Sequence, residues 1–89
     1  MEIIVISALW CPSCLVMKKI YKELEINYPM VKFNFLDYDF DEEIVKTYNV
    51  SNKLPVLIIK KNDLEIKRIV GEHSLEDYEI VIKECLDEI

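Results

Sequence analysis

Two short runs of consecutive apolar residues constrain the fold of this chain more than any other feature. Residues 3–6 read Ile-Ile-Val-Ile, and residues 56–59 read Val-Leu-Ile-Ile. A strand with one face in water alternates apolar and polar residues, whereas a strand covered on both faces is a continuous apolar run. We therefore expect two central strands in a sheet that has helices on both faces.

Between these runs the apolar residues recur first at the spacing of a helix and then at that of a strand. Residues 12–25 are predicted to form an amphipathic helix, whose apolar stripe is Val16, Met17, Ile20, Tyr21 and Leu24. Residues 31–37 alternate, with Val31, Phe33 and Phe35 on one side, which is typical of a strand with one exposed face. Residues 41–48 are predicted to form a short helix capped by Asp41.

The last third of the chain predicts a hairpin and a helix. Residues 65–70 are expected to return antiparallel to the second apolar run, and Ser74 is expected to cap a helix that runs to the C-terminus. The apolar stripe of this helix is Leu75, Tyr78, Val81, Ile82, Cys85, Leu86 and Ile89. The predicted fold is α/β, with the order β-α-β-α-β-β-α in a single domain over residues 1–89. Its four-stranded mixed sheet has the order 2-1-3-4, with three helices distributed over both faces.

The composition narrows the possible classes of function. Of 89 residues, 52% are hydrophobic and one is glycine, which excludes a disordered or low-complexity chain. The net charge of −6 disfavours nucleic-acid binding through a basic surface. No apolar run approaches the roughly 18 residues of a membrane span, and residues 1–6 do not resemble a secretory signal. We therefore expect a cytoplasmic monomer that binds neither nucleic acid nor membrane.

Two of the three cysteines lie in the sequence Trp10-Cys11-Pro12-Ser13-Cys14, where the first predicted strand ends and the first predicted helix begins. The unpaired N–H groups and positive dipole end of a helix stabilise a thiolate, so Cys11 is the predicted nucleophile. Cys14 falls on the same turn as the less exposed thiol. Pro12 suits a first helical turn because it has no N–H group to leave unsatisfied. Trp10 is predicted to be an apolar lid beside the sulfur.

Leu54-Pro55 directly precedes the second apolar run, and Gly71 separates the last strand from the last helix. Together with residues 10–14, these positions resemble the thioredoxin family over essentially the whole chain. The resemblance is to the compact form of that fold, without the N-terminal strand and helix of full-length thioredoxins. Considered alone, Pro55 would be an ordinary trans proline, but the resemblance implies a cis bond and packing against the two sulfurs. Gly71 is expected at a positive φ or a close approach.

The resemblance implies a thiol–disulfide oxidoreductase with a Cys11/Cys14 dithiol–disulfide cycle and no cofactor or metal. The implied substrate-binding residues are Trp10, Pro12, Ser13, Leu54, Pro55 and Gly71. The backbone of Leu54 would hydrogen-bond an extended substrate segment. Expected partners are disulfide-containing protein substrates, with a reductase or a low-molecular-weight thiol as electron donor. The lack of a recognisable signal favours a protein-disulfide reductase over an oxidase.

The chain departs from the thioredoxin pattern at the two positions whose side chains assist proton transfer at the second cysteine in that family. Thioredoxins usually carry a buried Asp in the first strand and a Lys in the next, and we match these positions to Val5 and Phe33. Neither side chain can move a proton. Activation of Cys14 must therefore depend on water, on a mobile neighbour or on the leaving thiolate. Pro12-Ser13 also replaces the Gly-Pro of thioredoxins, so no reduction potential is carried over.

A module that binds a soft metal is the alternative, because a Cys-x-x-Cys pair can also hold copper(I) or zinc. Against it, no second Cys or His pair could close a zinc site, since His73 and Cys85 are isolated. Cys85 is predicted to be a small buried hydrophobe of the last helix, and His73 a solvated or helix-flanking residue. The acidic stretch from 37 to 43 lacks the glycine and ligand spacing of a calcium loop and is interpreted as a solvated helix start.

Overall fold

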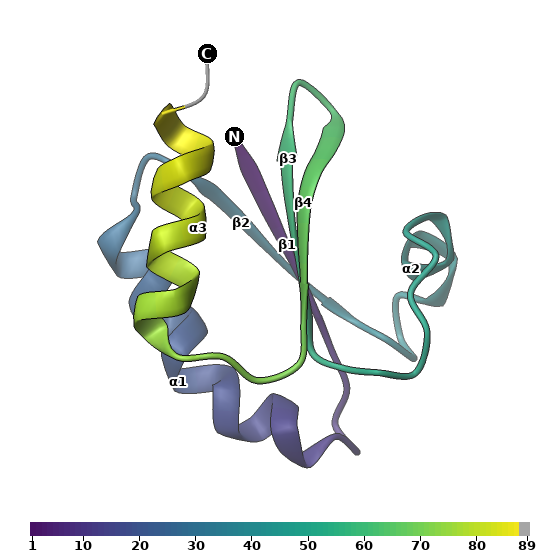
Figure 1. Cartoon of the computed structure of the whole chain (residues 1–89). Coiled ribbons are helices and arrows are strands. Elements are labelled where there is room, and N and C mark those ends of the chain that lie inside the picture. Colours follow the sequence, from purple (N-terminus) through teal and green to yellow (C-terminus); the bar gives the residue numbers. More distant parts are fainter. Residues whose placement is uncertain (88–89) are drawn as a thin grey trace.

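The computed structural model describes residues 1–87 and has the predicted order of elements (Figure 1). These are β1 (Glu2–Ser7), α1 (Pro12–Asn27), β2 (Lys32–Asp37), α2 (Glu42–Thr47), β3 (Val56–Lys61), β4 (Leu64–Val70) and α3 (Leu75–Asp87). The sheet has the order β2-β1-β3-β4, with β1 parallel to β2 and the other pairs antiparallel. The predicted α/β fold, with its 2-1-3-4 mixed sheet, is confirmed.

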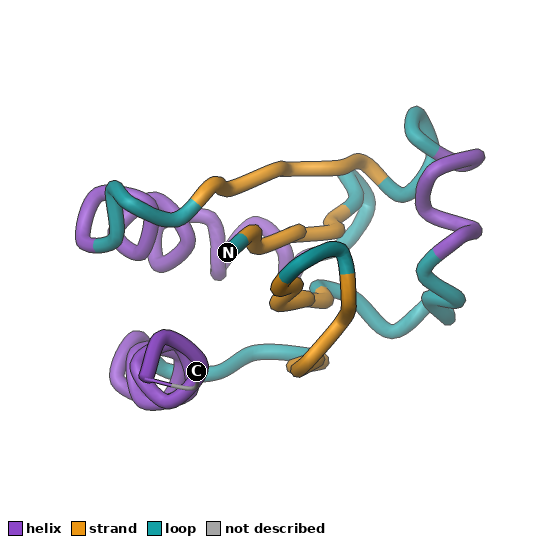
Figure 2. Tube along the Cα trace, turned by 90° about the horizontal axis from the view of Figure 1, so that it is seen from above, coloured by secondary structure: helices purple, strands orange, loops and turns teal. Residues whose placement is uncertain are grey.

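The sheet lies between two unequal layers of helix. Figure 2 shows the strands between the two long helices, α1 and α3, on one side and the short α2 on the other. Alternate residues of β1 point to opposite sides, so Ile3 and Val5 pack in the cluster under α1 and α3, whereas Ile4 and Ile6 pack in the cluster under α2. The continuous apolar runs therefore reflect burial on both faces, as predicted.

The buried side of α1 differs from the predicted stripe, which included Val16 and lacked Cys14. Cys14, Met17, Tyr21 and Leu24 are buried at the helical period, but Val16 is 63% exposed. Val16 lies outside the narrow face that contacts the sheet, because consecutive residues are about 100° apart around a helix. Its inclusion in the stripe was wrong.

The edge strand β2 is covered less than the alternation predicts. Val31, which precedes the strand, is buried, and Phe33 is half-buried and stacks on Phe35. Phe35 itself is 49% exposed. The reason is that α1 does not close over this part of β2, which leaves a cavity beside Phe35.

The helix starts show one correct prediction and one error. Ser74 caps α3, since its Oγ accepts the N–H of Asp77 at 3.1 Å. Asp41 occupies the N-cap position of α2, but its side chain accepts the N–H of Asp37 at 2.8 Å and makes no cap hydrogen bond. On α3, Tyr78 and Ile82 are buried as predicted, and Ile89 lies outside the described residues. Within residues 1–87, no helix has the length and apolar character needed to cross a membrane.

Candidate functional site

The first turn of α1 is built around the sulfur of Cys11. Cys11 is the N-cap residue in extended conformation, and its Sγ accepts the N–H of Cys14 at 3.2 Å. Pro12 follows at the start of the helix, where the absence of an N–H costs nothing, and the first turn contains no acidic residue. A helix N-terminus with a donated N–H on the sulfur is the environment that favours a thiolate.

One loop contacts Cys11 directly, and a second loop joins the first through Pro55. The Leu54–Pro55 peptide bond is cis, and the Leu54 carbonyl oxygen lies 3.7 Å from the Cys11 Sγ, which donates its S–H to it. Gly71, at a φ of +88°, donates its N–H to the Pro55 carbonyl at 2.8 Å. The structure thus brings Cys11, the cis-proline loop and Gly71 together, and the positive φ predicted for Gly71 is present.

The two thiols are buried to the same extent. Cys11 and Cys14 are each 5% exposed, so the expectation that Cys14 is the less exposed thiol was wrong. The cause is the loop at Leu54, whose backbone carbonyl lies against the Cys11 sulfur and shields it from solvent. The local sequence around Cys11 does not indicate this contact. Burial, and then the hydrogen bond with Cys11, raise the pKa of Cys14 from 9.0 to about 12.

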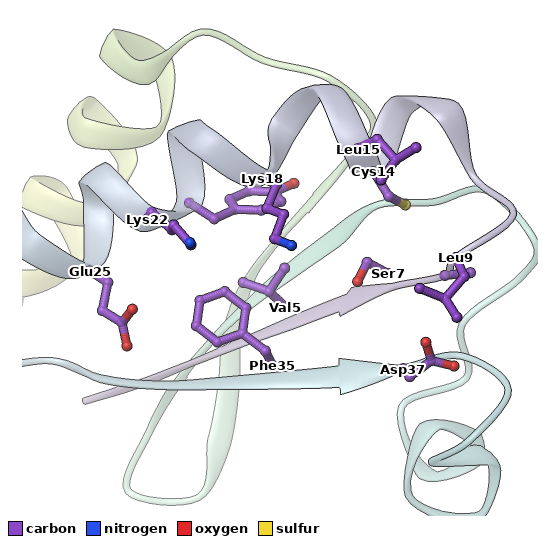
Figure 3. Close-up of a pocket in the computed structure, with 12 residues that line it drawn as sticks. Val5, Ser7, Leu9, Cys14, Leu15, Lys18, Lys22, Glu25, Phe35 and Asp37 are labelled. Atoms are coloured by element: carbon purple, nitrogen blue, oxygen red, sulfur yellow. The ribbon is translucent and has the colours of Figure 1, made fainter.

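Cys14 forms part of the wall of a cavity of about 400 Å³ that is partly open to solvent (Figure 3). The cavity lies between α1 and the neighbouring strands β1 and β2, and its lining includes Val5, Phe35 and Lys18. In the β1–β2 register, Val5 faces Phe35, whereas Phe33 faces Ile3. The residue opposite Val5 near Cys14 is therefore Phe35 and not Phe33, although both are phenylalanines that cannot carry a proton.

Trp10 makes its hydrogen bond and its aromatic contact with the loop that follows β2. Its side chain is 54% exposed, its indole N–H donates to Asp39 Oδ2 at 2.7 Å, and its ring meets Tyr38 edge-on. The predicted position of the indole beside the sulfur stays a prediction. Asp39 was interpreted as part of a solvated helix start, and no local signal in the sequence identifies it as the partner of an indole 29 residues away.

On the opposite side of the motif, Ser13 is tied to the loop that contains Gly71. Ser13 Oγ donates to Glu72 at 2.7 Å, while Pro12 is exposed. Glu72 is the second residue that sequence reasoning missed, because its partner is 59 positions distant. All eight predicted site residues therefore lie at one end of the sheet, in the motif after β1 or in the loops that contact it.

The remaining candidates lie elsewhere. Cys85 is buried in the cluster under α1 and α3, as predicted, and His73 flanks α3 with a ring nitrogen 3.0 Å from the Val70 carbonyl. Over residues 1–87, no group of three His, Cys, Asp or Glu side chains is arranged to hold a metal ion. The soft-metal alternative stays a prediction without a third ligand among those residues.

The thioredoxin family model matches residues 2–84. Thioredoxin H5 of Oryza sativa subsp. japonica is 37% identical over 65 residues, which are 73% of this chain and 47% of that protein. Thioredoxin H2-1 of the same organism is 32% identical over 73% of this chain and 46% of its own length. The chain thus spans about half the length of these curated relatives.

Solved structures of thioredoxins also resemble the chain. Reduced thioredoxin of Schistosoma mansoni superposes with a TM-score of 0.83 at 31% identity, over 93% of this chain and 76% of that one. A poplar thioredoxin h superposes with a TM-score of 0.88, over 99% of this chain and 78% of that one, and its 23% identity supports the fold alone. The match of the family model to nearly the whole chain shows that this protein belongs to the thioredoxin family.

Proposed function

We propose that this chain is a thiol–disulfide oxidoreductase in which Cys11 and Cys14 alternate between dithiol and disulfide. The observation that carries the proposal is the position of Cys11 as the N-cap of α1, with the N–H of Cys14 on its sulfur at 3.2 Å. This arrangement stabilises negative charge on one sulfur and holds a second thiol one turn away. Membership of the thioredoxin family supports the same activity.

The cycle transfers two electrons from the protein to a substrate disulfide. The thiolate of Cys11 attacks one substrate sulfur, the substrate S–S bond breaks, and the other substrate sulfur leaves as a thiolate. Cys14 then loses its proton to solvent and attacks the Cys11 sulfur. The mixed disulfide breaks, the second substrate thiolate leaves, and a Cys11–Cys14 disulfide remains. A reductase or a low-molecular-weight thiol would return two electrons to it, so the chain needs no further cofactor.

The substrate would bind where the motif meets the two loops. Trp10, Pro12 and Ser13 would lie on one side of the substrate, and Leu54, Pro55 and Gly71 on the other. Leu54 and Pro55 are buried, so their backbone and not their side chains would meet the substrate. The Leu54 carbonyl, which accepts the Cys11 S–H in the free protein, becomes available when Cys11 is a thiolate or a mixed disulfide. A backbone acceptor next to the reactive sulfur suits an extended protein segment, which is recognised by strand-like hydrogen bonds more than by its side chains.

The physiological role proposed is that of a cytoplasmic protein-disulfide reductase that acts as a single-domain monomer. The small number of cysteines is consistent with a reducing compartment. Cys85 lies in the core cluster on the other face of the sheet from Cys11 and Cys14, which supports a two-cysteine cycle because a thiol there does not compete for the mixed disulfide.

Reduction of insulin by dithiothreitol, followed by turbidity, tests the activity. The protein is expected to accelerate the reduction, and Cys85→Ser, the matched cysteine control, is expected to retain the rate. Cys11→Ser should abolish the acceleration, because it removes the attacking sulfur. Cys14→Ser should accumulate a mixed disulfide at Cys11 that mass spectrometry detects. A Cys11→Ser variant with undiminished activity would refute the proposal.

A further inference from the structure

The cavity beside Cys14 is the place where the second thiol of the proposed cycle meets solvent. Cys14 is otherwise buried, and the apolar part of the cavity wall includes Val5, Leu9, Leu15 and Phe35. Two of these residues, Val5 and Phe35, pair across β1 and β2. The strands thus offer no ionisable side chain beside Cys14 except Asp37 near the end of the cavity. A positive charge that stabilises the thiolate of Cys14 must therefore come chiefly from α1.

Lys18 is the charged residue of the cavity wall that lies one helical turn from Cys14. Residues four apart on a helix share a face, with Cβ atoms about 5–6 Å apart. Figure 3 shows the Lys18 side chain leaving α1 toward the strands, with its ammonium group above Val5 and Phe35 in the cavity. Within residues 1–87, no hydrogen bond or ion pair holds this ammonium group, so it is free to turn toward the sulfur.

We propose that Lys18 is a positioning residue for the second step, whose ammonium group stabilises the thiolate of Cys14 inside this cavity. The inference rests on the proposed dithiol cycle and deepens it. The proton of Cys14 leaves to water in the cavity, and Lys18 keeps its own proton throughout. The freed electron pair of Cys14 forms the bond to Cys11, and the substrate sulfur departs with the electrons of the mixed disulfide. The lysine therefore acts by charge alone. Its side chain is exposed and the cavity is partly open, so water screens this charge and the expected effect on the second step is modest.

The other charged groups around the cavity are less suited to this role. Lys22 lies a further turn along α1, and Glu25 lies at the far end. Asp37 has the wrong sign to stabilise a thiolate, and its Oδ1 already accepts the N–H groups of Asp39 and Phe40 at 2.9 and 3.0 Å. The remaining ionisable group is Tyr21, which burial keeps protonated by raising its pKa. Lys18 is the cation that the fold places nearest along the helix to Cys14.

The test follows the second step alone, in a Cys85→Ser background with one equivalent of Ellman's reagent. Attack by Cys11 releases one nitrothiobenzoate, and attack by Cys14 on the resulting mixed disulfide releases a second one in a step independent of reagent concentration. The rate of this second step is recorded from pH 6 to pH 10 for Lys18→Met and Lys18→Arg. Lys19→Met is the matched control, because Lys19 is the neighbouring exposed lysine of α1 and does not line the cavity.

Lys18→Met is expected to slow the second step by about three- to tenfold at pH 7 and to shift its pH profile to higher pH, since a tenfold change corresponds to one pKa unit. Lys18→Arg should restore most of the rate, and Lys19→Met should leave both rate and profile unchanged. The proposed role of Lys18 is overturned if the second step in Lys18→Met stays within twofold of the Lys19→Met rate and has the same pH profile. The dithiol cycle would stand in that case. If the Lys18-containing protein releases no second nitrothiobenzoate, the dithiol cycle itself is overturned, and the inference with it.

Discussion

The two faces of the sheet are covered by helices to different extents. Under α1 and α3, two helices of 16 and 13 residues bury a cluster that includes three tyrosines and Cys85. Under α2, a helix of six residues and the loops around it cover a smaller cluster, which contains Cys11 and Cys14. The same two central strands supply both clusters. The cysteines of the proposed cycle thus belong to the thinly covered face, and Cys85 belongs to the well-covered one.

This difference separates the face that provides most of the stability from the face that carries the proposed chemistry. Long helices with regular apolar stripes bury large side chains away from water and provide most of the hydrophobic stabilisation. A short helix and loops leave room for a backbone carbonyl, an N-cap sulfur and an approaching substrate to meet. Cys14 lies at the boundary, since it belongs to the cluster under α2 and also borders the cavity next to α1. The predictions below test this division, from the largest effect to the smallest.

The largest difference is expected between truncations of one buried apolar side chain on each face, with the losses compared per carbon atom removed, three for Ile82→Ala and two for Val45→Ala. Ile82 on α3 and Val45 on α2 are both buried apolar residues. Ile82→Ala should lower the free energy of unfolding by about 2–5 kcal/mol, because it leaves a cavity in the larger cluster. Val45→Ala removes two methyl groups and should cost about 1.6 kcal/mol, at roughly 0.8 kcal/mol for each buried group. Urea denaturation of the reduced proteins measures both. Equal losses per carbon atom, or a larger one for Val45→Ala, would contradict the comparison.

A smaller effect is expected for Tyr78, through which α3 on the well-covered face contacts the Gly71 loop of the site. Tyr78 is buried on α3 and donates its hydroxyl proton to the Gly71 carbonyl at 3.1 Å, while the Tyr21 hydroxyl lies 3.2 Å away. Tyr78→Phe loses both interactions and should cost about 1–3 kcal/mol, whereas Tyr21→Phe loses only one and should cost about 0.5–1.5 kcal/mol.

The double-mutant cycle of Tyr21→Phe and Tyr78→Phe, measured by urea denaturation, gives the energy of the hydroxyl pair. The insulin assay of each single variant then shows whether the Gly71 loop depends on α3. If Tyr78→Phe is as stable and as active as Tyr21→Phe, the hydrogen bond to Gly71 does not link the two regions.

The smallest effect is expected in alkaline solution, where both faces contribute. Burial is the first cause that raises the pKa of Cys14 to about 12 and the pKa values of Tyr21, Tyr28 and Tyr78 above 10. Each group holds its proton more tightly in the folded chain than in the unfolded one. The resulting stability is complete below pH 9 and is lost as the pH rises through the folded values.

The free energy of unfolding of the reduced protein should therefore fall progressively above pH 9, as measured by urea denaturation between pH 7 and pH 11. Cys14→Ser should remove the part of this loss that begins at pH 9, and Tyr21→Phe the part that begins near pH 10. A stability that is constant up to pH 11 would show that these groups are not shielded from water as the structure indicates.

The fold could be predicted because its signals are local. The two continuous apolar runs identified the central strands, and the helical spacing of Met17, Tyr21 and Leu24 identified the buried side of α1. Val16 and Phe35 were misplaced for a common reason: periodicity says which side chains could be buried, but not how far a neighbouring helix extends to cover them. Lengths and crossing angles of helices decide that, and they follow from packing of the whole domain.

The site could be predicted only in part, for a related reason. The motif around Cys11 and Cys14 is local, and its position at the start of a helix suffices to suggest its chemistry. The pairs Trp10–Asp39 and Ser13–Glu72 join residues far apart in the sequence, and nothing in their local surroundings indicates a partner. The cavity beside Cys14 has the same character, because it arises from the space that α1 leaves over the edge of β2.

The most direct test of the central claim is the reduction potential of the Cys11–Cys14 pair, by equilibration of the Cys85→Ser protein in defined thiol buffers. The fraction of disulfide is read by mass spectrometry after alkylation of free thiols. A single reversible two-electron couple near or below about −230 mV is predicted for a reductase. A couple near about −120 to −180 mV would contradict the direction of electron flow, and the absence of a reversible couple would contradict the dithiol cycle itself.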